Sequence, residues 1–309
     1  MSASFRTVPT AMPRPLAIAT VAAARPLDED LPPLVAALEA IGIEVQVCDW
    51  DDPAVDWSGF ELVLLRSTWD YTQRLPEFLA WCAHVSARTT LLNPADLVRW
   101  NSDKHYLRDL SEAGVAVVES VFIEPDEAAD GFPDYPEFVV KPAVGAGSRD
   151  TRRHLRQGRA TAIVHVRELL DGGRAVLVQP YQTAVDTLGE TALMFFDGEF
   201  SHAIRKGPLL QRDSSATQLL FAPEQIDPRT PSAAELALAR QVLDALPFTT
   251  PLYARIDLLP TPDGPRLLEL ELIEPSLFFQ HSATAAARFA ARLVARSAAR
   301  VRDRPLPAP

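Results

Sequence analysis

The strongest constraint on the fold comes from residues 252–279, which read LYARIDLLPTPDGPRLLELELIEPSLFF. Two apolar segments flank a turn-forming sequence at 262–265, and this pattern predicts a β-hairpin. Glu269 and Glu271 alternate with leucines on the second strand, so period-two alternation puts both carboxylates on one face of the sheet. The turn folds the first strand back, and Asp257 can therefore face the two glutamates.

Three carboxylates gathered on one sheet face would repel each other unless a cation shared them. A hard divalent ion prefers oxygen ligands, so Mg²⁺ is the predicted occupant of a site formed by Asp257, Glu269 and Glu271. On this stretch alone, the alternative is an exposed sheet face whose glutamates are solvated.

The composition limits the classes of protein to which the chain can belong. With 309 residues, of which 47% are hydrophobic, the chain is long enough for two or three domains. The formal net charge of −11 argues against a surface for nucleic acid or for an anionic membrane, so we expect small-molecule partners. No stretch approaches about 18 uninterrupted apolar residues, and no membrane span is expected. A cytoplasmic location fits these features, which also allow a homodimer.

The two cysteines, Cys48 and Cys82, lie in apolar surroundings. They lack the spacing of a zinc site and are too few for a disulfide framework. We therefore expect buried free thiols.

The N-terminal part has the pattern of a parallel α/β unit. After a tail at 1–14, strands are predicted at 16–21, 43–47, 61–66 and 89–93, with a helix at 31–40. The third of these strands is apolar without alternation, which is typical of a strand covered on both faces.

Polar and aromatic residues crowd the carboxyl end of that third strand, in the sequence RSTWDY. In open α/β sheets this edge is where ligands bind, so the candidate substrate-binding residues are Arg66, Ser67, Trp69, Asp70 and Tyr71. Arg66 is expected to hold the carboxylate of an acceptor substrate by a bidentate contact. The alternative is a capped helix start with Trp69 as a core residue.

Two lysines and a glycine-rich loop predict a phosphate site. Lys104 is expected in the first turn of a helix, where a cation opposes the helix dipole unless an external anion binds there. Lys141 lies in a β-branched strand, where its burial would be costly without an anionic partner. The following loop carries Gly145, Gly147 and Ser148, whose backbone N–H groups could surround phosphate oxygens. Because the lysine precedes the glycines, this is not the P-loop motif, and a plain turn is the alternative.

A strand predicted at 175–182 is interrupted by Pro180. The interruption would free the peptide groups of Gln179 and Tyr181 to bond a ligand, for which an adenine edge is one candidate.

A second hairpin is predicted with its turn at 197–198. Its last strand ends with the cationic doublet Arg205 and Lys206, on an otherwise acidic protein. A loop from 209 to about 231 and a helix at 233–246 lead from this hairpin to the carboxylate hairpin.

Taken in this order over residues 16–290, these features resemble the ATP-grasp ligase superfamily. The resemblance implies an α/β and α+β protein with the ATP-grasp fold, in which two lobes clasp ATP behind an N-terminal parallel α/β domain. The implied domains are 1–95 on the acceptor side, 96–180 as the central lobe with the glycine-rich loop, and 181–309 as the C-terminal lobe with the Mg²⁺-binding carboxylates.

The resemblance also implies a role for each candidate residue at the nucleotide. These are Lys104 and Lys141 on the phosphates, Gly145, Gly147 and Ser148 in a mobile loop above them, Gln179 and Tyr181 at adenine, Asp186 or alternatively Glu190 at the ribose, and Arg205 on the transferring phosphoryl group. Asp257, Glu269 and Glu271 match the Mg²⁺ ligands. The commoner family pattern has Asn where Glu271 stands, so Glu274 is an alternative ligand.

Within the superfamily, the segments RSTWDY and LELELIEPSLFF are similar to those of the O-ureido-serine cyclo-ligases, which close the cycloserine ring. The implied reaction is activation of a carboxylate by ATP to an acyl phosphate, followed by attack of an amine. Ring closure within one substrate is the first hypothesis, and ligation of two amino acids or peptides is the alternative. A nucleotide-binding regulator without catalysis is the hypothesis from another class.

Overall fold

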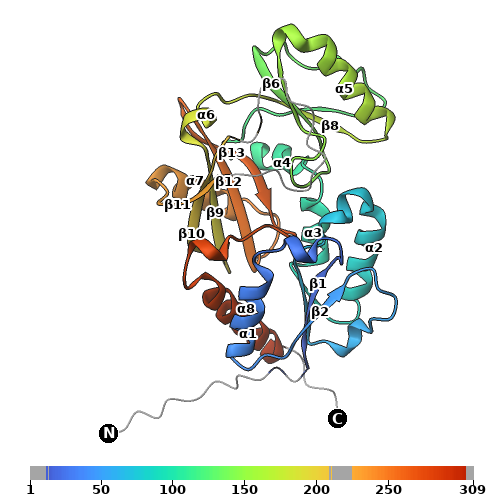
Figure 1. Cartoon of the computed structure of the whole chain (residues 1–309), viewed down its shortest axis with the longest axis vertical. Coiled ribbons are helices and arrows are strands. Elements are labelled where there is room, and N and C mark those ends of the chain that lie inside the picture. The colour runs from blue at the N-terminus through green and yellow to red at the C-terminus, as the bar shows by residue number, and fades with distance from the viewer. Residues whose placement is uncertain (1–11, 13, 209, 211–224, 304–309) are drawn as a thin grey trace.

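The computed structural model describes residues 12, 14–208, 210 and 225–303. Most of the tail predicted at 1–14 and most of the loop predicted from 209 to about 231 lie outside this part. Three β-sheets make up the described fold (Figure 1), and they fall in succession along the chain, at 16–92, 121–180 and 190–271. The domain boundaries at 95 and 180 stay predictions.

The first sheet is parallel, with the strand order β2-β1-β3-β4. Its strands are β1 (Leu16–Thr20), β2 (Val45–Asp49), β3 (Leu62–Leu65) and β4 (Thr90–Leu92). β3 is buried along its whole length, as predicted for a strand covered on both faces, and β1 is buried along its whole length as well. The covering helices are α1 (Leu31–Ala40), which also contacts the C-terminal helix α8 (Ala285–Asp303), and α2 (Leu75–Ser86).

The second sheet is antiparallel, with the order β5-β8-β6-β7. It consists of β5 (Val121–Ile123), β6 (Glu137–Pro142), β7 (Arg152–Leu155) and β8 (Val176–Pro180). Helix α5 (Arg159–Asp171) covers one face, and this lobe stands apart at the top of Figure 1. Apolar side chains of the helix and the strands share one core, which includes Phe138, Val140, Ala162 and Val166.

The third sheet is antiparallel, with the order β11-β10-β9-β12-β13. Its strands are β9 (Glu190–Phe196), β10 (Glu199–Lys206), β11 (Ile226–Arg229), β12 (Tyr253–Thr261) and β13 (Gly264–Glu271). Helix α7 (Ala233–Asp244) packs on β13 and begins with a capping box between Ser232 and Glu235. Helix α8 packs on β9 and β10.

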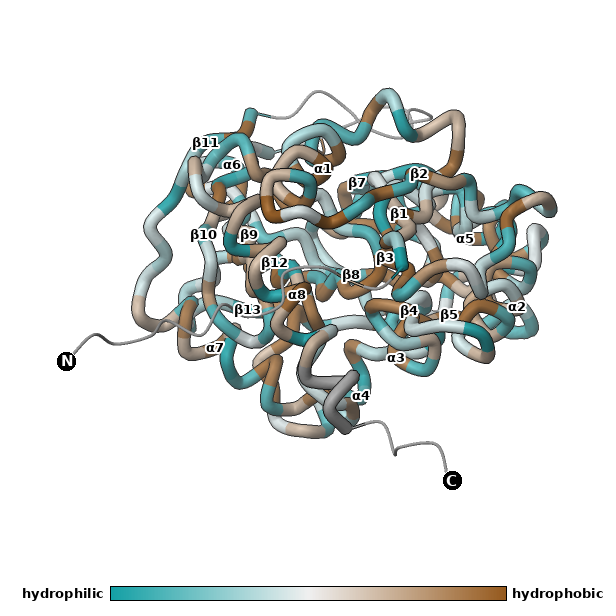
Figure 2. The backbone as a smooth tube through the Cα atoms, turned by 90° about the horizontal axis from the view of Figure 1, so that it is seen from below, coloured by the Kyte–Doolittle hydropathy of each residue, from teal (hydrophilic) through white to brown (hydrophobic). Residues whose placement is uncertain are grey.

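Short helices connect the sheets. They are α3 (Ala95–Asn101), α4 (Tyr106–Glu112), α6 (Val185–Leu188) and the 3₁₀ turns at Arg25–Leu27, Trp57–Gly59, Trp69–Gln73, Arg156–Gly158 and Phe279–His281. Hydrophilic and hydrophobic stretches alternate along the helices (Figure 2), as expected of helices with one buried face. None of the helices within the described ranges is both long and apolar enough to cross a membrane.

Two buried asparagines fix the carboxylate hairpin against the first half of the chain. The Asn93 amide donates to the carbonyls of Tyr253 and Leu272, at 3.0 and 2.7 Å. The Asn101 amide donates to the Leu270 carbonyl at 2.8 Å and accepts from the Leu272 N–H at 2.8 Å. The face of the hairpin that carries the carboxylates is thereby held in one orientation.

Candidate active site

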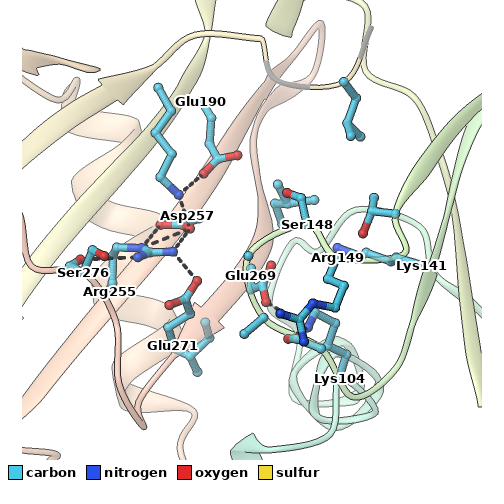
Figure 3. Close-up of a pocket in the computed structure, with 18 of the residues that line it drawn as sticks. Lys104, Lys141, Ser148, Arg149, Glu190, Arg255, Asp257, Glu269, Glu271 and Ser276 are labelled. Atoms are coloured by element: carbon cyan, nitrogen blue, oxygen red, sulfur yellow. Dashed lines mark hydrogen bonds and ion pairs between the residues drawn. The ribbon is translucent and has the colours of Figure 1, made fainter. Parts of the chain in front are cut away.

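A cavity of about 840 Å³ lies where the three sheets meet. Residues from the 3₁₀ turn at Trp69–Gln73, the loop after β6, the end of β8 and the β12–β13 hairpin line it. Polar side chains, most of them charged, face each other across this space (Figure 3): Lys104, Lys141, Ser148 and Arg149 come from one side, and Glu190, Arg255, Asp257 and Glu271 from the other.

The carboxylate hairpin has the predicted register, with Asp257 opposite Glu269 and Arg255 opposite Glu271. A β-bulge shifts the pairing after Asp257. Because of the bulge, the leucine alternation is only partly as predicted: Leu270 and Leu272 enter the core, whereas Leu268 lines the cavity. The hairpin therefore presents its acidic face to the cavity.

Two cations neutralise the buried carboxylate Asp257. Arg255 donates from Nε to Oδ1 and from Nη2 to Oδ2, each at 2.9 Å, and it also pairs with Glu271. Lys206 Nζ lies 2.7 Å from Asp257 Oδ2 and 2.7 Å from Glu190 Oε1. The result is a continuous network of alternating charge along the cavity wall.

The network sets the protonation of its members. Burial alone would raise the pKa of Asp257, but Arg255 and Lys206 together hold that pKa below its usual range. Burial raises the pKa of Glu271 to about 7 in spite of Arg255, and it raises the pKa of Glu190 to about 7 in spite of Lys206. Asp257 is therefore the most firmly ionised carboxylate of the three.

The predicted Mg²⁺ ligands are neutralised by protein cations in this structure. Glu269 Oε1 lies 3.0 Å from Lys104 Nζ, while Asp257 and Glu271 pair with Arg255. No group of three His, Cys, Asp or Glu side chains among the described residues has the arrangement of a metal site. The donor set is nevertheless of the type that suits Mg²⁺, since all its atoms are carboxylate oxygens on two paired strands.

The predicted phosphate side of the cavity is present. Lys104 and Lys141 are both buried and line the cavity, and Lys104 Nζ also donates to the Gly145 carbonyl at 2.9 Å. Burial lowers the pKa of Lys141, which Glu269 partly offsets. Lys104 precedes helix α4 instead of lying in its first turn, because the helix begins only at Tyr106.

The predicted glycine-rich loop lies over the lysines. Gly145, Gly147 and Ser148 all line the cavity. The chain takes positive φ at Gly147 and Ser148, +64° and +58°, which turns successive backbone groups in the way that anion-binding loops do. The next residue, Arg149, also lines the cavity, and no described residue forms a hydrogen bond or ion pair with its side chain.

The predicted adenine end is only partly as expected. Gln179 and Tyr181 line the cavity, but their peptide groups are not left free by Pro180. Gln179 pairs with Val139 in the sheet, and the Tyr181 N–H donates to the Glu137 carbonyl at 2.9 Å. The strand pairing therefore continues past the proline.

The predicted ribose ligand Asp186 does not line the cavity. Its carboxylate accepts from Arg153 at 3.1 Å and from the Tyr181 hydroxyl at 2.5 Å. Arg153 in turn lies 3.4 Å from the centroid of the Tyr181 ring. The alternative residue Glu190 does line the cavity, where it pairs with Lys206.

Arg66 is not available to a substrate. Its side chain is fully buried and pairs with Asp28 at 3.0 Å and Asp30 at 3.4 Å, while Nη1 donates to the Pro275 carbonyl at 2.9 Å. Asp30 also accepts the backbone N–H of Phe279 at 2.8 Å. Arg66 therefore holds the segment after β13. Contrary to the prediction, its guanidinium is not free to contact an acceptor carboxylate.

The other residues of RSTWDY divide between the cavity and the core. Trp69 and Tyr71 line the cavity, with the Trp69 Nε1–H donating to the Glu274 carbonyl at 3.0 Å. Ser67 is fully buried and does not line it. Asp70 bonds Trp50 and Arg74 instead of facing the cavity.

Arg205, the arginine predicted to bind the phosphoryl group, does not lie at the cavity either. The Arg205 guanidinium donates to the carbonyls of Leu188 and Thr187, at 2.8 and 3.0 Å, and does not line the cavity. Its neighbour Lys206 and the residue Arg255 lie there instead. The sequence carried a signal for Arg255, because a residue two positions before Asp257 on one strand shares its face.

The chain is similar in sequence to proteins of cycloserine biosynthesis. The family model described as "D-cycloserine synthetase DcsG, N-terminal domain" matches residues 16–93. The cycloserine biosynthesis protein DcsG of Streptomyces lavendulae is 42% identical over 294 residues, which cover 91% of this chain and 98% of that protein.

The fold is also similar to those of solved structures of ligases. The crystal structure of D-cycloserine synthetase DcsG matches with a TM-score of 0.86 and 41% identity, covering 91% of this chain and 99% of that one. The ATP-grasp ligase PsnB, solved with a minimal precursor, Mg and ADP, matches with a TM-score of 0.62 and 17% identity, covering 93% and 97% of the two chains. The likeness to PsnB is one of fold.

Proposed function

Because the chain belongs to the DcsG family of ATP-grasp ligases, we propose that it uses ATP to activate the carboxylate of a small amino-acid-like substrate and joins it to a nitrogen. The name of the relative from Streptomyces lavendulae supports ring closure of the cycloserine type as the specific reaction. The observation that carries the proposal is the cavity in which two buried lysines face a hairpin that carries the buried Asp257 and the half-buried Glu269 and Glu271. Phosphoryl transfer needs this combination of positioning and charge neutralisation.

Lys104 and Lys141 would bind the phosphates of ATP, and the loop with Gly145, Gly147 and Ser148 would close over them. The burial of both lysines supports this role, because a buried ammonium gains much from an anionic ligand. Arg149 would add a third cation from the same loop. At the other end, Gln179 and Tyr181 would contact adenine through their side chains.

Mg²⁺ is the metal that this site would hold, with Asp257, Glu269 and Glu271 as the proposed ligands and Glu274 as an alternative. When bound, it would neutralise charge on the phosphates. Binding would require the carboxylates to exchange their present partners Arg255 and Lys104, which could then pair with phosphate oxygens. The Mg and ADP in the PsnB structure support this assignment by analogy of fold.

The reaction would proceed in two steps. An oxygen of the substrate carboxylate attacks the γ-phosphorus, the bond to the bridging oxygen breaks, and ADP leaves with the electron pair. The nitrogen lone pair then attacks the acyl carbon, phosphate leaves with the pair of the C–O bond, and the nitrogen loses its proton to solvent. Arg255 would stabilise the negative charge on the transferring phosphoryl group, the role that the family resemblance implied for Arg205.

We place the enzyme in the cytoplasm as part of this proposal. The free thiols of Cys48 and Cys82 support a reducing compartment. A homodimer stays a prediction.

The test is a screen for phosphate release with ATP, Mg²⁺ and a panel of amino acids, ureido derivatives and hydroxamates. Release that depends on one compound class supports the proposal, and release with none of them contradicts it in favour of a nucleotide-binding regulator. Product analysis then separates the two ligase reactions, because cyclisation consumes one substrate and two-substrate ligation consumes two.

A further inference from the structure

Glu274 differs from the other carboxylates on the cavity wall that are buried or half-buried. Asp257, Glu190, Glu269 and Glu271 each pair with a lysine or arginine, and the buried Asp30 pairs with Arg66. Glu274 is only 7% exposed and lines the cavity, yet it forms no ion pair with any described residue. A buried carboxyl group without a cation is costly unless a ligand supplies the missing charge or donors.

The surroundings fix this carboxyl group in place. The Tyr71 hydroxyl forms a hydrogen bond with it, and the Trp69 Nε1–H holds the carbonyl of the same residue at 3.0 Å. Arg66 donates to the carbonyl of the next residue, Pro275, at 2.9 Å. The backbone at Glu274 and Pro275 is thus held by two hydrogen bonds and the side chain by Tyr71, which preorganises the carboxyl group for recognition.

We propose that Glu274 is a specificity-determining residue that binds the ammonium group of an amino-acid substrate, with Tyr71 positioning its carboxyl group. This inference rests on the proposed function and names its substrate class: a small molecule with both a carboxylate to be activated and a free primary amine that does not react.

The charges around the cavity favour a substrate whose ammonium group lies at Glu274 and whose carboxylate lies at the cations, over a substrate bound in the reverse orientation. The cations on the cavity wall that could receive the substrate carboxylate are Arg149, together with Arg255 and Lys206, which now pair with carboxylates of the protein. The ammonium group has Glu274.

The test is direct binding by calorimetry, with and without a non-hydrolysable ATP analogue. The probes are O-ureido-serine in both enantiomers, which carries a free amine, and its N-acetyl derivative, in which the amine is blocked. We expect the wild-type protein to bind one enantiomer at least about tenfold more tightly than its N-acetyl derivative, the size of effect expected for a charged hydrogen bond. In Glu274→Gln this preference should fall to about twofold or less.

A matched variant separates recognition of the ammonium group from a general loss of acidic charge at the cavity. Glu29→Gln removes an exposed carboxylate that lines the same cavity and bonds Gln280, and it should keep the wild-type preference. An unchanged preference in Glu274→Gln, equal weakening of both probes, or binding of neither probe by the wild-type protein would overturn the inference. A raised Mg²⁺ requirement in Glu274→Gln, with the preference intact, would assign Glu274 to the metal instead. The proposed function fails separately, by absence of phosphate release.

Discussion

Arg255 and Asp257 lie two positions apart on β12, and the Arg255 guanidinium donates to both oxygens of the Asp257 carboxylate, at 2.9 Å each. The two side chains share the cavity face of the strand because strand residues alternate between faces. This pair couples a proposed metal ligand to the proposed phosphoryl-binding cation, so a substitution of Arg255 also changes the electrostatic surroundings of Asp257.

The first prediction concerns Arg255. Arg255→Lys keeps a positive charge but loses the planar fork that holds Asp257 and Glu271 together. We expect kcat for phosphate release to fall by about a hundredfold or more, as for the loss of one electrostatic contact in a transition state. Steady-state kinetics at saturating ATP measure this.

Arg205→Ala is the matched control. Because Arg205, among the described residues, donates to backbone carbonyls outside the cavity, we expect kcat to stay within about twofold and the free energy of unfolding to fall by about 1 kcal/mol. Loss of turnover in Arg205→Ala with Arg255→Lys active would return the catalytic role to Arg205.

The second prediction concerns the metal. Glu269→Gln removes a charged oxygen ligand while keeping the size of the side chain, so formation of ADP should be abolished without loss of the fold. Circular dichroism checks the fold, and coupled detection of ADP checks turnover. Turnover at the wild-type rate would remove Glu269 from the metal site.

The third prediction concerns Arg66, which is a core residue in this structure. Arg66→Met leaves Asp28 and Asp30 buried without their cation, and breaking a buried pair in this way costs about 3–5 kcal/mol. Urea unfolding should show a lower midpoint concentration and a free energy of unfolding that is smaller by this amount. An unchanged midpoint together with a raised KM for the acceptor alone would restore the substrate-binding role.

The fourth prediction concerns the dependence of stability on pH. His165, on α5, is buried and bonds the Asp150 carbonyl at 3.1 Å. Burial lowers the pKa of His165 from 6.5 to about 4, and Arg152 adds to the effect. Between these values the unfolded chain binds a proton that the folded chain does not, so the free energy of unfolding should fall as the pH drops from 6.5 to about 4. Burial also lowers the pKa of His202, which acts in the same direction.

Chemical unfolding across this pH range tests the effect. His165→Gln should flatten the slope of unfolding free energy against pH, whereas His84→Gln, at an exposed position on α2, should keep the wild-type slope. Equal slopes in wild type and His165→Gln would contradict the assignment.

The sequence predicted the parts of the site that depend on local pattern. Alternation placed Glu269 and Glu271 on one face, and the turn brought Asp257 opposite Glu269, as the register confirms. Arg205 and Lys206 are adjacent on one strand, so alternation predicts that only one of them faces the cavity. The sequence pattern alone does not identify which one. The packing of β10 between β9 and β11 decides it.

The sequence could not predict contacts between distant segments. Arg66 looked available because its partners Asp28 and Asp30 lie more than thirty positions away, in the connection before α1. Asp186, on α6, looked free because its partner Arg153 lies on β7, more than thirty positions earlier in the chain. Only the fold brings these groups together: burial removes Arg66 from the ligand, and Asp186 is engaged by Arg153 and Tyr181 outside the cavity.

The most direct test of the central claim is phosphate release by the purified protein with ATP and Mg²⁺, measured with O-ureido-serine present and absent. We predict release that depends on the added compound, with one phosphate and one ADP formed for each substrate consumed and a cyclic product without a second substrate. Release at the same rate without the compound, or none under either condition, would contradict the assignment as a ligase of this kind.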